Sequence, residues 1–264
     1  MLANRLSVAV IAFTLPLIFV ANDVACSEGL RIETDVYVGD ETEPVSHNVT
    51  LFDAGTVYDF AEDPEEVAIF RPPTSTHPGR FILLDLQTKQ RTEVSTKRIA
   101  GLMKKLVRWA AEQDDPLLKF SADPTFEEQF DEETGALSLE SKAWQYKVAT
   151  VPTENAAMLA RYREFTDWYT RLNTMMNGNP PPGPRLELNA ALQTHSVVPV
   201  EIHRKIDSQS AEVRATHLFT WRLSREDRAR LDQARRYLTS FEKVNNEKYL
   251  ASRASEEVVR GQSK

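Results

Sequence analysis

Few side chains of this sequence have the type and spacing that chemistry needs. The five histidines form no HxH or HxxxH pair, the spacings that place two imidazole ligands on one strand or helix. Glu201 and His203 fall on one face of an expected strand, so they could contribute two ligands to a metal site. A solvated strand face explains the pair more simply. We therefore predict no metal, no cofactor and no catalytic residue.

An acidic stretch at residues 131–140 is the second candidate for ion binding. Asp131 and Glu133 match two ligand positions of a calcium loop, but the remaining oxygen ligands of an EF-hand are missing. Gly135 and the polar residues before it are typical of a tight turn, and Leu137 and Leu139 alternate after it. The pattern favours a β-hairpin over a calcium site.

Cys26 is the only cysteine, and it follows an uncharged apolar run at residues 6–21. That run is shorter than the roughly 20 residues of a membrane span and has the size of the central part of a signal peptide. We predict that residues 1–27 are a signal peptide and that the protein is secreted or periplasmic. Two alternatives stay open. Cleavage after Ala25 would expose Cys26 as a lipid anchor, and the leader could also remain uncleaved.

The chain has 264 residues and a net charge of −7, and this acidic balance argues against a nucleic-acid partner. Without the leader, the length suits one large domain that buries a core without disulfides. We predict a single domain over residues 28–250 and a polar C-terminal tail at residues 251–264.

Alternation of apolar and polar residues predicts a meander of short antiparallel strands in the first half of the chain. These strands are expected at residues 31–38, 47–60 (a hairpin), 66–70, 80–86 and 90–94. Later strands are expected at residues 117–120, 126–141 (a hairpin), 143–150, 197–206 and 213–223.

Amphipathic helices are expected between the groups of strands. The first, around residues 97–108, has a basic face made of Lys97, Arg98, Lys104, Lys105 and Arg108. The longest is expected to start at a Thr153 cap and to end at Asn177, with a helical turn at 188–192 after it. A capping box at Ser224 opens the last helix. This order predicts an α+β fold, a curved, half-barrel-like antiparallel sheet of about 11–12 strands with helices packed on one face.

The meander at residues 49–94, the helix after it, the hairpin FDEETGALSL at 130–139 and the later strand pair resemble the periplasmic lipoprotein carriers of the lipoprotein-localisation type. In that family helices cover an antiparallel half-barrel, and the hollow between them holds acyl chains. The family has a helix before its first strand, whereas a strand is expected first here, and its functional arginine has no assigned counterpart. The resemblance therefore implies a class of ligand and not a site.

The function that follows is an exported, non-catalytic protein that binds a lipid or another apolar ligand between its sheet and its helices. The candidate lining comes from the long helix, at Met158, Tyr162, Phe165 and Tyr169, although packing of this stripe into a filled core explains it more simply. Contact with a membrane surface through Cys26 or the basic helix stays open, although a solvated face explains the basic helix more simply. Two alternatives remain, an exported hydrolase and a structural or interaction module of the cell envelope.

Overall fold

The computed structural model describes residues 29–207, 209 and 211–261, so the expected signal peptide and Cys26 lie outside the described residues. The strands are β1 (Leu30–Val38), β2 (Ser46–Asp53), β3 (Thr56–Ala61), β4 (Glu66–Arg71), β5 (Arg80–Asp85), β6 (Gln90–Ser95), β7 (Glu127–Asp131), β8 (Ala136–Glu140), β9 (Trp144–Pro152), β10 (Val197–Ile206), β11 (Val213–Thr220) and β12 (Glu242–Lys243). The helices are α1 (Thr96–Ala111), α2 (Pro116–Ala122), α3 (Ala156–Asn177), α4 (Gly183–Thr194), α5 (Arg225–Ser240) and α6 (Asn246–Gly261).

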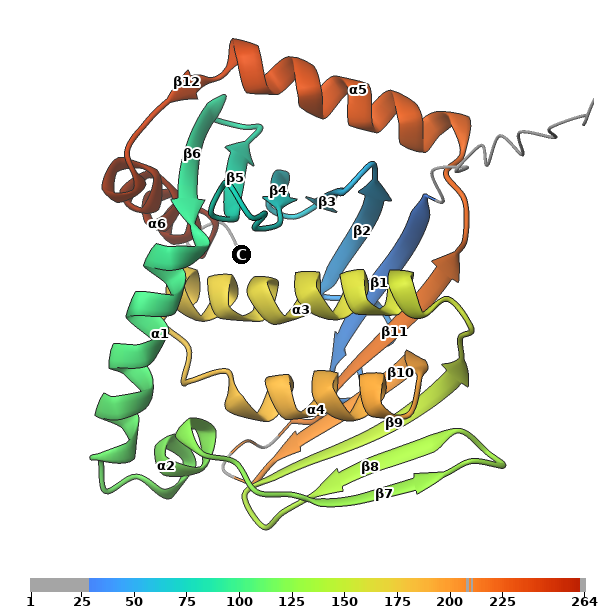
Figure 1. Ribbon diagram of the computed structural model, residues 1–264. Helices are drawn as coiled ribbons and strands as arrows, with labels where there is room; N and C mark the ends of the chain where they lie inside the picture. The colour runs from blue at the N-terminus through green and yellow to red at the C-terminus, as the bar shows by residue number, and fades with distance from the viewer. Residues whose placement is uncertain (1–28, 208, 210, 262–264) are drawn as a thin grey trace, which may run out of the picture.

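All the described strands belong to one open sheet in the order β12-β6-β5-β4-β3-β2-β1-β11-β10-β9-β8-β7. Neighbouring strands are antiparallel, except that the short β12 runs parallel to β6. The sheet wraps around α3 and α4, and α3 crosses the strands (Figure 1). The predicted α+β class and the curved antiparallel sheet are confirmed.

Both faces of strands β2 to β5 are buried, because these strands alternate two sets of apolar side chains. One set, which includes Phe52, Phe70 and Phe81, packs against α3 on the side that we call the inner face. The other set, which includes Leu51 and Ile69, packs against α5 on the outer face. The sequence analysis placed the helices on one face, and the structure adds α5 on the other (Figure 1).

The far end of the sheet has its own apolar contact with α4. Leu188, Ala191 and Leu192 of α4 pack against inner-face residues of β8, β9 and β10. In β10 the pairing with β9 shifts between Pro199 and Glu201, where a bulge takes up one extra residue. Proline cannot donate to the ladder, and a bulge is where a sheet tolerates it.

The expected strand at residues 117–120 is wrong, because this segment belongs to the helix α2. Asp115 caps α2 with its carboxylate, which accepts from the backbone N–H groups of Leu117 (2.7 Å) and Leu118 (3.3 Å). Pro116 occupies the first turn, where a helix needs no N–H from it. The Asp115-Pro116 helix start therefore determines the structure of this segment, and the apolar run after it does not form a strand.

Three further boundaries differ from the expectation. The cap of α3 is Asn155 and not Thr153, since the Asn155 side chain accepts from the Met158 N–H at 2.9 Å. The expected turn at 188–192 is part of the twelve-residue α4. The strand β12 and the helix α6 follow α5, and α6 continues into the segment expected to be a polar tail. The end of α3 is as expected, with Gly178 in the left-handed conformation (φ 64°).

A charge at Phe165 tests the packing of α3 on the inner face. The Phe165 ring is buried and lies 5.8 Å from the Phe52 ring centroid and 6.1 Å from that of Phe70. Phe165→Asp removes these contacts and buries an unpaired carboxylate, so the free energy of unfolding should fall by about 4 kcal/mol or more. Urea denaturation measures this change. The control is Leu218→Asp, at a strand position that is 60% exposed. Similar losses in both variants would contradict the packing.

Candidate ligand-binding cavity

A cavity of about 390 Å³ lies between α3 and the inner face of β11, β1, β2, β3 and β4. On the helix side it is lined by one stripe of α3, made of Tyr162, Phe165, Thr166, Tyr169, Leu172, Asn173 and Met176. These residues recur every three or four positions and therefore share a face of the helix. Proteins bind small molecules in cavities of about 300–1,000 Å³, so this space is large enough for a ligand.

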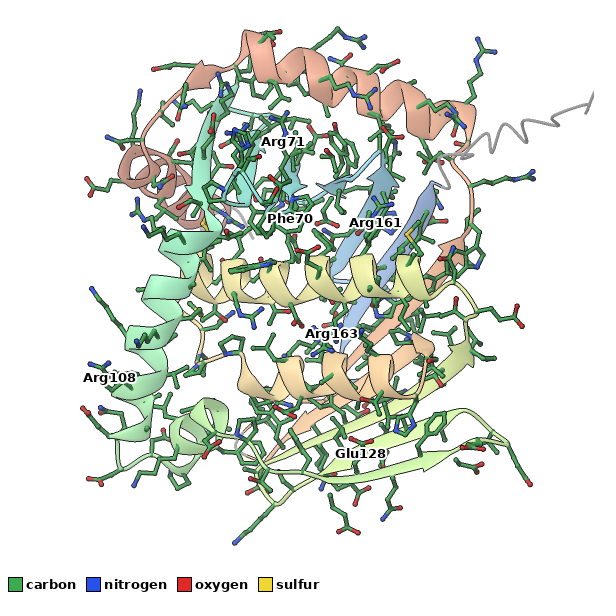
Figure 2. All side chains as sticks on the ribbon, viewed as in Figure 1. Phe70, Arg71, Arg108, Glu128, Arg161 and Arg163 are labelled. Atoms are coloured by element: carbon green, nitrogen blue, oxygen red, sulfur yellow. The ribbon has the colours of Figure 1, made fainter. Side chains whose placement is uncertain are left out.

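The cavity exists because side-chain size changes along the strands. One row of paired inner-face residues is large and apolar, namely Leu30, Phe52, Val57, Phe70, Phe81 and Val94. A second row of paired residues lies four positions away from the first along β1, β2 and β3. It consists of His217 (β11), Thr34 (β1), Asn48 (β2) and Ala61 (β3). The large row supports α3, as Phe70 does where it lies between the sheet and the helix (Figure 2). The smaller side chains of the second row leave the space beneath the helix unfilled.

The sheet side of the cavity carries polar side chains and is called the polar floor. It is made of Thr34, Asn48, Thr50, Asp59 and His217, with Asp59 at its centre. Its buried carboxylate accepts three hydrogen bonds, from Thr50 Oγ1 (2.6 Å), Tyr169 OH (2.6 Å) and Asn48 Nδ2 (3.0 Å). Burial raises the pKa of Asp59 above its ordinary value, and these hydrogen bonds oppose part of the rise. Burial and the neighbouring Asp59 raise the pKa of Tyr169 well above its ordinary value. The Asp59–Tyr169 bond therefore ties the sheet to α3.

His217 forms the other end of the polar floor, beside Tyr162 and Arg185 in the cavity lining. Its Nδ1 atom lies 2.9 Å from Thr34 Oγ1, while its buried Nε2 atom has no hydrogen-bond partner. Burial, with a smaller contribution from the Arg185 charge, lowers the pKa of His217 to about 3. The imidazole is therefore neutral at physiological pH.

Three of the four side chains expected to line a cavity do so, namely Tyr162, Phe165 and Tyr169. Met158 is buried in the same apolar cluster but is not part of the cavity lining. The sequence does not predict the polar floor with Asp59, nor the position of Arg185 of α4 in the lining. An aspartate between apolar residues of a strand is a usable signal for Asp59. Arg185 had no such signal, since it follows a run of prolines in a segment expected to be irregular.

The candidate ion sites have simple structural roles. Both His203 ring nitrogens contact carboxylates, those of Glu201 and Glu212. Asp131 closes the β7–β8 turn by accepting from the N–H groups of Glu133 (2.8 Å) and Thr134 (3.2 Å). Within the described ranges, no three His, Cys, Asp or Glu side chains group as metal ligands.

The basic side chains expected on the first helix are exposed on α1, together with Leu102 and Trp109. Arg108, for example, points away from the body of the protein (Figure 2). Among the described residues, no helix combines the length and apolar character that crossing a bilayer requires. Contact between α1 and a membrane surface stays a prediction.

A scan of protein-family models gives no match to this chain, and a search of curated proteins gives none either.

The low pKa of His217 predicts a loss of stability in acid. Between about pH 3 and pH 6.5 the unfolded chain binds a proton that the native His217 does not, so stability is lost as the pH falls through this window. The loss should approach about 1.4 kcal/mol per pH unit. In His217→Gln this contribution is absent, while that of Asp59 remains. Urea denaturation at pH 4.5, 5.5 and 7 measures both proteins, with His77→Gln at an exposed site as the control. A constant difference between wild type and His217→Gln across this range would contradict the assignment.

Proposed function

We propose that the protein binds an amphiphilic molecule, one with an apolar body and a polar end, in the cavity beneath α3. The observation that carries the proposal is the combination of a cavity of about 390 Å³ with two kinds of lining. Phe165, Leu172 and Met176 supply apolar surface from the helix, and the strands supply the polar floor. Small-molecule sites combine apolar surface with fixed polar groups, and polar or charged side chains make up about half of this lining.

The resemblance to the lipoprotein carriers supports this proposal, since those proteins also hold apolar chains between an open sheet and its helices. The helix lining adds support because Met176 and Leu172 are flexible or compact apolar residues next to rigid aromatic rings. Such a surface can adapt to an irregular apolar ligand. We propose an acyl chain as the apolar body.

Asp59 and His217 are the titratable groups of the cavity floor nearest its centre that a hydrolase could use, and Asp63 and Glu66 also line the cavity. Both Asp59 oxygens already accept hydrogen bonds from the protein, which leaves the carboxylate fixed as a structural acceptor. An imidazole with a pKa of about 3 is a weak general base, because proton transfer is most efficient from groups with a pKa near the working pH. These two properties favour binding over catalysis.

Filling the cavity should abolish binding of a neutral apolar probe. Ala61 lines the cavity from β3, and Ala61→Leu places a larger side chain in that space. We expect dodecanol to displace the fluorescent probe N-phenyl-1-naphthylamine from the wild type. The dodecanol affinity of Ala61→Leu should be at least about tenfold lower, which is about 1.4 kcal/mol.

The control for this test is Ala149→Leu, the same substitution at an exposed position of β9. It should bind dodecanol as the wild type does. A wild type that releases no probe on addition of dodecanol would refute the proposal. Equal affinities in the two leucine variants would place the ligand elsewhere.

We also propose that the protein works outside the cytoplasm after its leader is removed, because the apolar run at residues 6–21 and the small residues after it fit a signal peptide. The intact mass of the protein purified from its native host should correspond to a chain that begins after Ala25 or after Ser27. A mass that starts at Cys26 and carries added diacylglycerol would support the lipid-anchor alternative. A mass that still includes residues 1–20 would contradict cleavage.

A further inference from the structure

A cationic side chain at one end of the cavity, Arg185, lacks an acidic partner among the described residues. Arg185, in the first turn of α4, lines the cavity together with His217 and Tyr162. Arg204 of β10 is two residues from each of the buried Ile202 and Ile206. It therefore shares their face of the strand, which is the inner side of the sheet. Within the described ranges, neither arginine has an aspartate or glutamate at ion-pair distance.

The charge of Arg185 acts on several titratable side chains around this end of the cavity. Burial and then the charge of Arg185 lower the pKa of Arg204, and the same charge contributes to the low pKa of His217. Arg185 also opposes the rise that burial causes in the pKa of Tyr162. Two positive charges that repel each other in a partly buried site raise the free energy of the empty protein. The N-terminal end of the α4 dipole adds positive potential at Arg185.

Two arginines of α3 that lie near α4 are paired with an acidic residue, unlike Arg185. Asp167 lies 3.9 Å from both Arg163 and Arg171. Arg163 extends between α3 and α4 (Figure 2), and it also donates to Gln193 of α4. The interface between the two helices thus supplies an acceptor to these cations and none to Arg185.

One unused hydrogen-bonding atom belongs to a side chain of the same cavity lining. His217 Nε2 is buried and has no partner, and neither has the buried Nε atom of Arg204. Buried polar atoms are almost always hydrogen-bonded, so an unpartnered one needs an explanation. A neutral imidazole that accepts from Thr34 at Nδ1 carries its proton on Nε2 and can donate it to a ligand.

We infer that Arg185, His217 and Tyr162 bind the carboxylate headgroup of a single-chain fatty acid whose chain lies along α3. The inference rests on the proposed function and names the ligand class. A guanidinium can donate two parallel hydrogen bonds to a carboxylate, and the tyrosine hydroxyl and imidazole can each donate one more. Tyr162 and Met176 are fourteen residues apart on α3, or about 21 Å. The cavity is therefore elongated, and its volume is at the lower end of the range for ligands, which suits one chain and not two.

The test compares sodium dodecanoate with dodecanol, which has the same chain and no charge. Calorimetric titration of the full-length mature protein should show that wild type binds dodecanoate at least about tenfold more tightly than dodecanol. Arg185→Met keeps much of the apolar side-chain length but loses the charge, so it should lower the affinity for dodecanoate and remove this preference. Its melting temperature should not fall, because Arg185 has no ionic partner to lose.

The matched control is Arg214→Met, because Arg214 packs at 4.0 Å over the Tyr37 ring on the outer face of the same β11 strand. It should bind both probes as wild type does. Equal binding of dodecanoate and dodecanol by wild type would overturn the headgroup site and leave the apolar cavity proposal standing. Absence of binding for both probes would overturn both proposals. Binding of inorganic phosphate that depends on Arg185, without a preference for dodecanoate over dodecanol, would identify a free-anion site and overturn the headgroup assignment.

Discussion

The contact between α3 and a row of aromatic side chains on the sheet determines the interior of this protein. Phe52 and Phe70 meet Phe165, and Phe81 meets Tyr169 at a centroid distance of 6.4 Å. Large rings at one end of the strands keep the helix at a fixed height above the sheet. Where the strands continue with Thr34, Asn48 and Ala61, smaller side chains leave space on the same side of the sheet, and all three line the cavity. The same contact therefore provides both the core and the cavity.

Burying the polar floor of the cavity costs free energy, which the apolar contacts of the core must offset. An aspartate among apolar residues is unfavourable unless its hydrogen bonds are made, and Asp59 has three of them. One comes from Tyr169, so the helix and the sheet are joined by a directional bond as well as by packing. This bond fixes which side of α3 faces the floor. Stability that an apolar residue would have provided at position 59 is exchanged for a defined polar surface next to Phe165 and Leu172.

Sequence patterns identified the strands and the long helix but could not assign both faces of the sheet. In β2, Val49 and Leu51 alternate with Asn48 and Thr50, which is the usual pattern of a strand with one face in water. In the structure, α5 covers the apolar side of β2 and α3 covers its polar side. The alternation therefore predicted the strand correctly but wrongly indicated that its polar face lies in water. The stripe on α3 could be predicted because its residues recur every three or four positions within one continuous segment. Arg185 reaches the cavity only through the packing of α4 on β8 to β10, which no local pattern contains.

Charge is distributed in a way that makes the two halves of the proposed ligand depend on each other. The protein carries a net charge of −7, so its long-range field repels small anions, while Arg185 and Arg204 attract them only at short range. A free anion gains the contact with Arg185 but must cross that field and lose its hydration. A fatty acid gains in addition the burial of its chain, at about 0.8 kcal/mol for each buried methylene group. In the proposed complex the chain would therefore supply the affinity and Arg185 would select the headgroup, so neither part of the cavity would be selective alone.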